Sequence, residues 1–305
     1  SADFTKEMTV SQEILSRISD TYRRIRNTAR FMLANMVGFD PAKNQIAVDE
    51  LVLLDAEMIR RMQLLSEKVM QHYRDYEFYE VGQALHHFCV DDLGGFYLDI
   101  IKDRQYTLKF DSHARRSCQT ALYWITDAFA RLMAPILSFT AQEIWESLPG
   151  TRSHKFIFAV TELEIPKIAE NTLIDWTIMQ SVKRVTNQAI EAARNDGLVK
   201  GSLSAAVTLY VGKEIKSVLA NLGDELRFIT ITSEVSLKNL SEAPTEALFA
   251  DDLADISVVV SASGFEKCDR CWHHRADVGS SSDHPTICLR CIDNIEGAGE
   301  TRKFA

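Results

Sequence analysis

Apolar residues in the first half of the chain recur at steps of three and four, which is the period of an amphipathic helix. The first stripe should end near Gly38, and Asp55 should cap the start of a second helix. A third helical pattern covers 79–101, where Gly94 and Gly95 can kink it. The first stripe consists of Tyr22, Ile25, Ala29, Met32, Leu33 and Met36, and the second includes Met58, Met62, Leu65, Val69 and Tyr73.

A fourth helix should start near Ser112 and end before Pro135, which interrupts the apolar pattern. Beyond it, Thr140 and Glu143 have the spacing of a capping box, in which the hydroxyl and the carboxylate each accept a hydrogen bond from a backbone amide. That helix should end at Gly150, which follows a proline. These segments predict an all-α bundle.

The period changes in the second half of the chain. A connector over 151–171 contains a short extended piece at 156–160, and a fifth helix should follow it and end at Gly197. Alternating apolar and polar residues then replace the helical period and predict strands, with one helix between the first two. We expect strands at 205–211, 228–233 and 256–261 and the helix at 215–226. These elements predict a small α+β unit over about 198–262.

Four cysteines near the end of the chain form the strongest chemical motif. Two C-x-x-C pairs, Cys268 with Cys271 and Cys288 with Cys291, are separated by sixteen residues. Each pair places two sulfurs on one side of an ion, and a loop of this length brings the second pair opposite, which suits tetrahedral zinc. The 42 residues from Gly264 hold few apolar side chains, so metal would supply stability that burial cannot. The sequence predicts one structural zinc with four Cys ligands.

Other interpretations of the cysteines are weaker. Paired disulfides would need an oxidising compartment, and a thioredoxin-like site would need one C-x-x-C in a βαβ setting. A catalytic zinc keeps a coordination position open, which four thiolates do not. His273, His274 and His284 could replace a thiolate, although four cysteines make this unnecessary. Cys89 and Cys118 lie on helical stripes and should be buried.

The segments together predict a multidomain, mainly α protein. We expect a helical bundle over 1–152, a connector helix with a small α+β domain over 153–262, and a C-terminal zinc knuckle over 263–305. A chain of 305 residues is long enough for two or three domains that each bury a core.

Charge and composition exclude several classes of protein. The longest apolar runs are far short of the roughly 18–20 residues that span a bilayer. The acidic start of the chain lacks the features of a secretory signal, and six cysteines without one indicate a reducing, cytoplasmic compartment. The net charge of −9 argues against a free-standing nucleic-acid binder. However, 241–257 holds five acids and no base, whereas 17–30 holds five arginines and one Asp, so a local basic face can still meet a polyanion.

The basic face predicted on the first helix consists of Arg23, Arg26, Asn27 and Arg30, at positions i, i+3, i+4 and i+7. Charged faces are usually only solvated or paired, but acids nearby are few, and Asn among arginines suits phosphate and sugar. Both interpretations stay open here. A weaker candidate set on the fifth helix consists of Lys183, Arg184, Asn187 and Arg194.

Trp272 directly follows a predicted zinc ligand and lies close to Arg270. A tryptophan on a small metal-held knuckle has little core to enter. It either packs against the α+β domain or stacks on an unpaired RNA base, with Arg270 contributing charge or hydrogen bonds. Residue type alone does not decide between packing and stacking.

Several motifs resemble a known family. The segment 22–31 (YRRIRNTARF) resembles the helix that opens the anticodon-binding domain of isoleucyl-, valyl- and leucyl-tRNA synthetases, and 134–145 (APILSFTAQEIW) looks like a later helix pair of that domain. The segment 191–205 is similar to the junction that follows it. The cysteine pairs with 299–305 (GETRKFA) resemble the zinc-bearing end of bacterial isoleucyl-tRNA synthetases, which separates these from the other two groups.

The resemblance covers essentially the whole chain and implies the C-terminal part of a class I ligase that attaches isoleucine to its tRNA using ATP. It implies RNA contacts for Arg23, Arg26, Asn27, Arg30, Arg270 and Trp272, isoleucine tRNA and the catalytic domain of the same chain as partners, and a monomer. His-x-Gly-His and Lys-Met-Ser-Lys-Ser do not occur. We therefore expect the catalytic and editing domains, with the sites for ATP and Mg²⁺, to be absent, and the chain alone to be inactive.

Two other functions compete with tRNA recognition. A zinc-held protein-interaction module would bind no RNA. An independent metal or thiol enzyme is disfavoured, because four thiolates close the metal shell and the sequence shows no convincing nucleophile and base.

Overall fold

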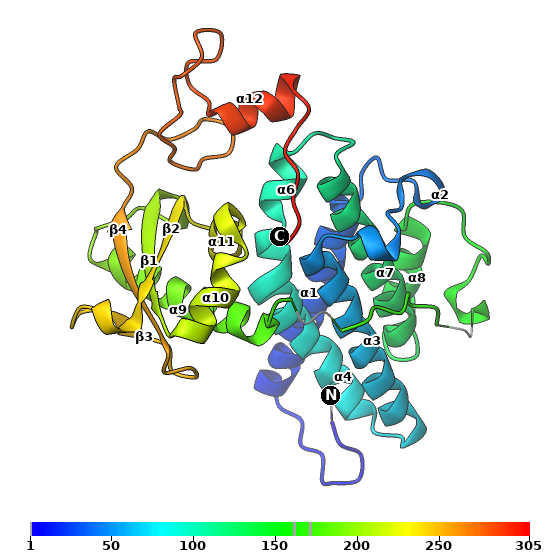
Figure 1. Cartoon of the computed structure of the whole chain (residues 1–305). Helices are drawn as coiled ribbons and strands as arrows, with labels where there is room; N and C mark the ends of the chain where they lie inside the picture. Colours follow the sequence, from blue (N-terminus) through cyan, green and yellow to red (C-terminus); the bar gives the residue numbers. More distant parts are fainter. Residues whose placement is uncertain (1, 161–162, 171–172) are drawn as a thin grey trace. The chain divides into compact units, whose positions relative to one another are not determined.

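A computed structural model of the chain describes residues 2–160, 163–170 and 173–305. The chain forms two compact units (Figure 1). The helical unit consists of Ser1–Asp99 and His113–Glu170, and the sheet unit consists of Ile100–Ser112 and Asn171–Ala305. The division into three domains at residues 152 and 262 remains a prediction. Among the described helices, none combines the length and the apolar character that crossing a membrane requires.

The helical unit is an all-α bundle, as the sequence predicts, and α7 (His113–Met133) is its central helix. It packs against α1 (Gln12–Ala34), α3 (Leu53–Arg74) and α8 (Ser138–Ser147). The core side chains come from the predicted stripes and include Met32, Met58, Met62, Val69, Leu122, Ile125, Phe129 and Leu132. Shorter elements complete the unit: α2 (Pro41–Asn44), the 3-10 turns η1 (Val48–Glu50) and η3 (Ile157–Ala159), and α4 (Phe78–His87).

The third predicted helix is distorted where the two glycines lie. After α4 the chain continues as a π-helical stretch, η2 (Phe88–Tyr97), and then as α5 (Leu98–Ile100). A Cβ on Gly94 would lie 3.0 Å from the carbonyl oxygen of Cys89, which is tighter than almost all real contacts. Glycine therefore lets the backbone of the wider π turn come this close.

Three local predictions in the helical unit are wrong. Asp55 does not cap α3, because the helix starts at Leu53 and the buried Asp55 carboxylate accepts hydrogen bonds from Tyr97 Oη at 2.8 Å and Ser117 Oγ at 2.6 Å. The predicted capping box of α8 does not form, because α8 already begins at Ser138. The Thr140 and Glu143 side chains instead form hydrogen bonds with side chains of α1. The expected extended piece at 156–160 contains the 3-10 turn η3. In each case a tertiary contact or a tighter turn replaces the local pattern.

The sheet unit contains a four-stranded mixed sheet in the order β2-β1-β4-β3 (Figure 1). β1 (Ala205–Val211) pairs in parallel with β2 (Glu234–Asn239) and antiparallel with β4 (Ile256–Ala262), and β4 pairs antiparallel with β3 (Leu248–Phe249). The long helix α9 (Trp176–Asn195) packs along β4. β1, β4 and α9 confirm the predicted elements.

The segment between β1 and β2 departs from the prediction. The predicted helix is split into α10 (Lys213–Ala220) and the 3-10 turn η5 (Gly223–Glu225). The predicted strand over 228–233 is wrong, because α11 (Leu226–Thr230) occupies most of it and the real strand, β2, follows. Short apolar runs do not distinguish a buried helix turn from a strand, which explains the error.

A segment from the first half of the chain belongs to the sheet unit. Ile100–Ser112, which includes α6 (Lys102–Thr107), groups with the C-terminal half and not with α4 or α7, its neighbours in sequence. The cysteine-rich tail ends in α12 (Leu289–Glu296), and the last residues run beside α6 (Figure 1). Sequence position alone therefore does not assign α6 to its unit.

Candidate metal centre and RNA-binding residues

The four predicted zinc ligands lie together. The Sγ atoms of Cys268, Cys271, Cys288 and Cys291 all lie within 4.8 Å of one another, and all four residues are buried. The distance is 3.7 Å between the sulfurs of Cys268 and Cys291, and 3.8 Å between those of Cys271 and Cys288. A tetrahedron with metal–sulfur bonds of about 2.3 Å has edges of about 3.8 Å, so the four sulfurs fit a zinc ion.

The cluster suits a cation electrostatically. Hydrogen bonding to Cys271 holds the pKa of Cys288 well below its usual range, and the same contact raises the pKa of Cys271. One thiolate is therefore stabilised at the expense of its neighbour, because like charges this close repel. A divalent metal would remove that conflict by binding all four as thiolates.

The three neighbouring histidines do not reach the sulfurs. His273 is buried, and its Nδ1 accepts a hydrogen bond from Arg227 Nη1 at 2.9 Å. Burial lowers the pKa of His273 to about 3, so its ring is neutral at pH 7. His274 Nδ1 lies 2.7 Å from the carbonyl oxygen of Phe265, and His284 Nε2 lies 2.7 Å from a Glu296 carboxylate oxygen. The alternative of a His ligand is not supported by these contacts.

The cysteine tail is held by charged groups on α6 that sequence reasoning missed. The Asp103 carboxylate pairs with the guanidinium groups of Arg290 and Arg302, the latter at 2.7 Å. Burial opposes ionisation of Asp103, but the charges of the two arginines outweigh it and hold the pKa of this carboxyl well below its usual range. The ion pairs join α6 to α12 and to the chain end.

A second contact fixes the last residues of the chain. The carboxylate of Glu225 accepts hydrogen bonds from the backbone amides of Lys303, Phe304 and Ala305, at 2.9, 2.8 and 2.8 Å. No sequence pattern marks Asp103 or Glu225, because their partners are distant in sequence.

Arg270, a predicted RNA contact, is engaged inside the sheet unit. Its Nη1 donates to the carbonyl oxygen of Thr107 on α6 at 2.6 Å. The arginine therefore joins the knuckle to α6, and only its remaining donors are available for another partner.

Trp272, unlike Arg270, extends into solvent. Its side chain is 59% exposed, and the Lys267 ammonium lies 5.1 Å from the centroid of its ring. Its backbone has φ of 66°, in the left-handed region, and its amide donates to the carbonyl oxygen of Cys268 at 2.9 Å. A side chain larger than glycine costs roughly 1–2 kcal/mol in that conformation. The fold therefore keeps a large indole in solvent at a position that favours glycine.

The predicted basic face on α1 is exposed along its length: Arg23, Arg26, Asn27 and Arg30 all reach solvent. Arg23 pairs with Asp20 at 2.7 Å, and Arg26 pairs with Glu143 of α8. A groove of about 280 Å³ between α1 and α8 is lined by Arg26, Arg30 and Glu143, among others. Surface pairs of this kind contribute little, so an RNA phosphate can replace the carboxylate at small cost.

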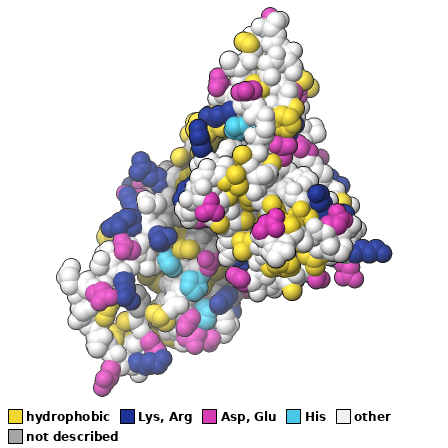
Figure 2. Space-filling view, turned by 90° about the vertical axis from the view of Figure 1, so that its left-hand side faces the viewer, with side chains coloured by type: hydrophobic (Ala, Val, Ile, Leu, Met, Phe, Trp, Pro, Cys, Tyr) yellow, Lys and Arg dark blue, Asp and Glu magenta, His cyan; other side chains and the backbone are white. Residues whose placement is uncertain are grey.

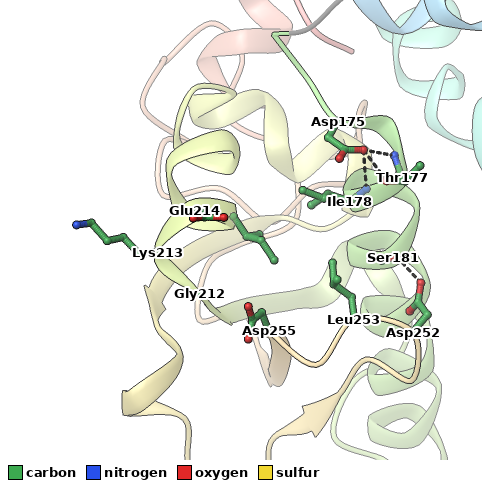
Figure 3. A pocket seen from close by; sticks show the side chains of 11 residues that line it. Asp175, Thr177, Ile178, Ser181, Gly212, Lys213, Glu214, Asp252, Leu253 and Asp255 are labelled. Carbon is green, nitrogen blue, oxygen red and sulfur yellow. Dashed lines mark hydrogen bonds between the residues drawn. The ribbon is translucent and has the colours of Figure 1, made fainter.

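Among the weaker candidates on α9, Lys183 is buried, Arg194 pairs with Glu191 at 2.7 Å, and Arg184 contacts the lining of an acidic cavity of about 670 Å³. Asp175, Glu214, Asp252 and Asp255 help to line it, and Lys213 extends away from the other labelled side chains (Figure 3). Asp252 accepts from Ser181 at 2.5 Å and from Arg184 at 2.6 Å. Part of the acidic 241–257 segment thus neutralises Arg184, and the other carboxylates would repel RNA here.

The two cysteines outside the metal cluster, Cys89 and Cys118, are buried, as predicted. Burial raises the pKa of Cys89 to about 12, so this thiol stays protonated at neutral pH.

Surface charges of both signs are mixed. On the face that Figure 2 shows, Lys and Arg side chains are interspersed with Asp and Glu side chains. That face presents no extended field of one sign.

A helical bundle joined to a small mixed sheet with a four-thiol knuckle defines a multidomain, mainly helical protein with a structural metal site. The family model of the anticodon-binding domain of tRNA ligases matches residues 55–209, and the chain belongs to this family. A second model, described as a zinc finger found in FPG and IleRS, matches residues 265–294, which contain the four cysteines.

The similar curated proteins are bacterial isoleucine–tRNA ligases. Those of Shewanella pealeana and Proteus mirabilis are 50% identical to this chain over 307 and 310 residues, or 99% and 100% of it. The ligase of Idiomarina loihiensis is 49% identical over 311 residues. The matches cover 32%, 33% and 32% of these relatives, so the chain spans about a third of their length.

Proposed function

We propose that this chain is the tRNA-recognising part of a ligase that joins isoleucine to its tRNA. The observation that carries the proposal is the 50% identity to an isoleucine–tRNA ligase over 99% of the chain. The anticodon-binding model and the zinc-finger model both match as well. ATP and Mg²⁺ would act in the part of the ligase outside this chain, so the chain itself forms no isoleucyl-adenylate. We place the ligase in the cytoplasm as a monomer.

The RNA would meet two surfaces of different chemistry. The basic face of α1, formed by Arg23, Arg26, Asn27 and Arg30, would contact phosphate and sugar and set the position of the tRNA. The exposed indole of Trp272 would stack on an unpaired base, because sequence-specific RNA recognition uses unstacked loop bases. Arg270 would act mainly by holding the knuckle on α6, in agreement with its bond to Thr107.

One zinc ion held by Cys268, Cys271, Cys288 and Cys291 would complete the knuckle. Four thiolates leave no open coordination position, so the ion would supply structure and no reaction step. The sulfur separations of 3.7 and 3.8 Å support this ligand set. The role of the metal is then to keep Trp272 in place.

Binding to tRNA tests the proposal. We expect the chain to bind isoleucine tRNA, to bind it more weakly when the anticodon bases are replaced, and to catalyse no isoleucine-dependent exchange of pyrophosphate into ATP. Equal affinity for the two tRNAs would remove the anticodon role. No affinity for any tRNA, together with capture of a protein partner, would favour an interaction module, and pyrophosphate exchange would show an adenylate site in this chain.

A further inference from the structure

The chain between β4 and α12, orange in Figure 1, begins with a short hairpin. Lys267 and His274 form an antiparallel bridge, and the amide of Arg275 donates to the carbonyl oxygen of Glu266 at 3.0 Å. Residues opposite each other in such a pair share one face, and so do residues two positions apart along a strand. Phe265, Lys267 and His274 therefore share a face of the hairpin, whereas Glu266 points to the other face.

Two exposed aromatic rings lie on the face that carries Lys267. The Lys267 ammonium lies 5.1 Å from the centroid of the Trp272 ring, so the indole is on this side of the hairpin. Phe265, at the opposite end of the hairpin, is 43% exposed. Aromatic rings with a cation between them are what surfaces for single-stranded RNA use, since each ring stacks on a base.

A pocket of about 270 Å³ lies beside Phe265, between the hairpin and the start of β2. All its lining residues belong to the sheet unit. They are Glu234, Phe265, His274, Arg275, Ala276 and Asp277. Pockets for drug-sized ligands are roughly 300–1,000 Å³, so this one suits a single nucleobase and not a complete nucleotide.

Hydrogen bonds hold the walls of the pocket in place. The amide of His274 donates to Ser233 Oγ at 2.6 Å, which ties the hairpin to the residue before β2. Ser263 Oγ donates to Glu234 Oε1 at 2.6 Å. His274 Nδ1 lies 2.7 Å from the carbonyl oxygen of Phe265, and because a carbonyl only accepts, Nδ1 carries the proton. In the neutral ring, Nε2 is then an acceptor.

The other polar groups of the pocket are mainly acceptors as well. Arg275 Nε and Asp277 Oδ1 are 3.8 Å apart, and these two buried atoms form no hydrogen bond with any residue that the structure describes. A polar group that reached them would remove the cost of leaving them unbonded. Glu234 has a second carboxylate oxygen besides the one that Ser263 binds. Two carboxylates and an imidazole suit a base that donates through an exocyclic amino group, which uracil lacks.

We propose that this pocket receives an unpaired base of the bound tRNA, next to the base stacked on Trp272, and favours a base with an exocyclic amino group. The inference rests on the proposed function and adds a second base contact to it. Lys267, between the two positions, is placed to meet the phosphate that joins the two nucleotides. Glu234 and Asp277 repel phosphate, so the base and not the backbone enters the pocket.

Binding of altered tRNA to the zinc-loaded chain provides the test. Each unpaired base of isoleucine tRNA that carries an amino group is replaced in turn, adenine or guanine by hypoxanthine and cytosine by uracil. We expect a position at which loss of the amino group weakens binding by about five- to 150-fold, the range for a good hydrogen-bonded contact to a base edge.

Glu234→Gln should abolish the discrimination at that position. The amide oxygen of Gln keeps the hydrogen bond from Ser263, and its NH₂ group, which only donates, then faces the pocket in place of an acceptor. A matched control, Glu266→Gln, removes the same charge on the other face of the hairpin and should keep the discrimination. Phe265→Ala, which removes a wall of the pocket, should lose it as Glu234→Gln does. Zinc content and melting temperature check that each variant is folded.

Each other outcome overturns the proposal. If the chain binds isoleucine tRNA but Glu234→Gln and Phe265→Ala discriminate as the unaltered chain does, the pocket holds no base, and the proposed function stands. If the unaltered chain binds no tRNA, the pocket and the proposed function both fail. Unchanged tRNA binding by Phe265→Ala, together with loss of a protein partner, would assign the pocket to a peptide side chain.

Discussion

The basic face of α1 and the zinc knuckle both carry arginines in the sequence, and the structure treats them in opposite ways. On α1 the arginines are exposed, and two of them pair with exposed acids, Asp20 and Glu143. On the knuckle, Arg290 and Arg302 are buried against Asp103. The knuckle instead exposes the indole of Trp272, at 59%.

The difference shows that residue type alone does not identify an RNA contact. Helical periodicity fixes which side of α1 reaches solvent, so its exposed arginines could be predicted. An irregular metal-held loop has no such period, so its sequence does not show which side chains reach solvent. Its arginines form contacts that stabilise the loop. If RNA binding uses both surfaces, one supplies charge and the other supplies stacking. The predictions below test that division of roles.

The largest effect should follow loss of a metal ligand. Cys288→Ser should release the zinc and disorder the knuckle, because structural zinc contributes roughly 10–16 kcal/mol of apparent binding energy in small fingers. Metal analysis should change from about one ion per chain to none, and hydrogen exchange should rise over 264–305. The basic face of α1 should be unaffected, so weak binding to any tRNA should persist. An ordered knuckle in the metal-free variant would contradict the assignment.

Asp103→Asn should have the next largest effect. It leaves the buried guanidinium groups of Arg290 and Arg302 without their shared counter-ion, which costs about 3–5 kcal/mol. Thermal unfolding should show the loss, whereas Asp111→Asn, an exposed acid in the same segment, should change stability little. Equal melting of the two variants would show that the ion pairs do not hold the knuckle.

The ion pairs of Asp103 should also make the free energy of unfolding depend on pH. Because the pKa of Asp103 is lower in the folded than in the unfolded chain, its contribution is complete above the ordinary carboxyl pKa of about 4 and is lost as the pH falls below it. Unfolding measured from pH 6 down to pH 3 should show a smaller loss of stability in Asp103→Asn than in the unaltered chain.

Trp272 separates stability from recognition. Trp272→Ala should weaken binding to isoleucine tRNA by about five- to 150-fold, the equivalent of roughly 1–3 kcal/mol of base stacking. The loss should shrink on a tRNA with replaced anticodon bases, and Trp272→Phe should recover part of it. Trp272→Gly should bind RNA as weakly as the Ala variant but melt at a higher temperature, because glycine accepts the positive φ without strain. Normal binding by a zinc-loaded Ala variant would mean that the indole has another purpose.

The smallest effects should come from the basic face. Each of Arg23→Ala, Arg26→Ala and Arg30→Ala should weaken binding to different tRNAs by similar factors and reduce the salt dependence. Glu143→Gln should strengthen binding by no more than about threefold, since it frees Arg26 from a weak surface pair. Arg17→Ala, on an earlier turn and paired with Glu13, serves as the control. An unchanged salt slope in the triple Arg variant would show that the face is only solvated.

The elements that the sequence predicts correctly are those with a strong local signal. The stripe of α7, the alternation of β1 and β4 and the two C-x-x-C pairs each rest on spacing that one segment contains. The errors fall where a distant residue decides the outcome. Asp55 and Thr140 have the chemistry of helix caps, but Tyr97, Ser117 and Tyr22 bind them instead.

The ion pairs of Asp103 with Arg290 and Arg302, which hold the knuckle on α6, could not be predicted for the same reason. Nothing local distinguishes Asp103 from the other acids of the helical half, and its two arginines lie 187 and 199 residues further along the chain. The ligands of the candidate metal site are visible in the sequence, whereas the side chains that hold the site on α6 appear only in three dimensions.

The position of α6 also sets the order in which the protein can be completed during synthesis. A ribosome adds about 5–20 residues per second, so the 199 residues between Asp103 and Arg302 take about 10–40 s to appear. During that interval α1, α3 and α7 can already assemble, whereas α6 still lacks Arg290 and Arg302, the ion-pair partners of its Asp103. Such a delay exposes a half-formed segment to chaperones and proteases. Stalling the ribosome shortly before residue 302 should therefore leave α6 open to cleavage, in a nascent chain whose earlier helices already resist it.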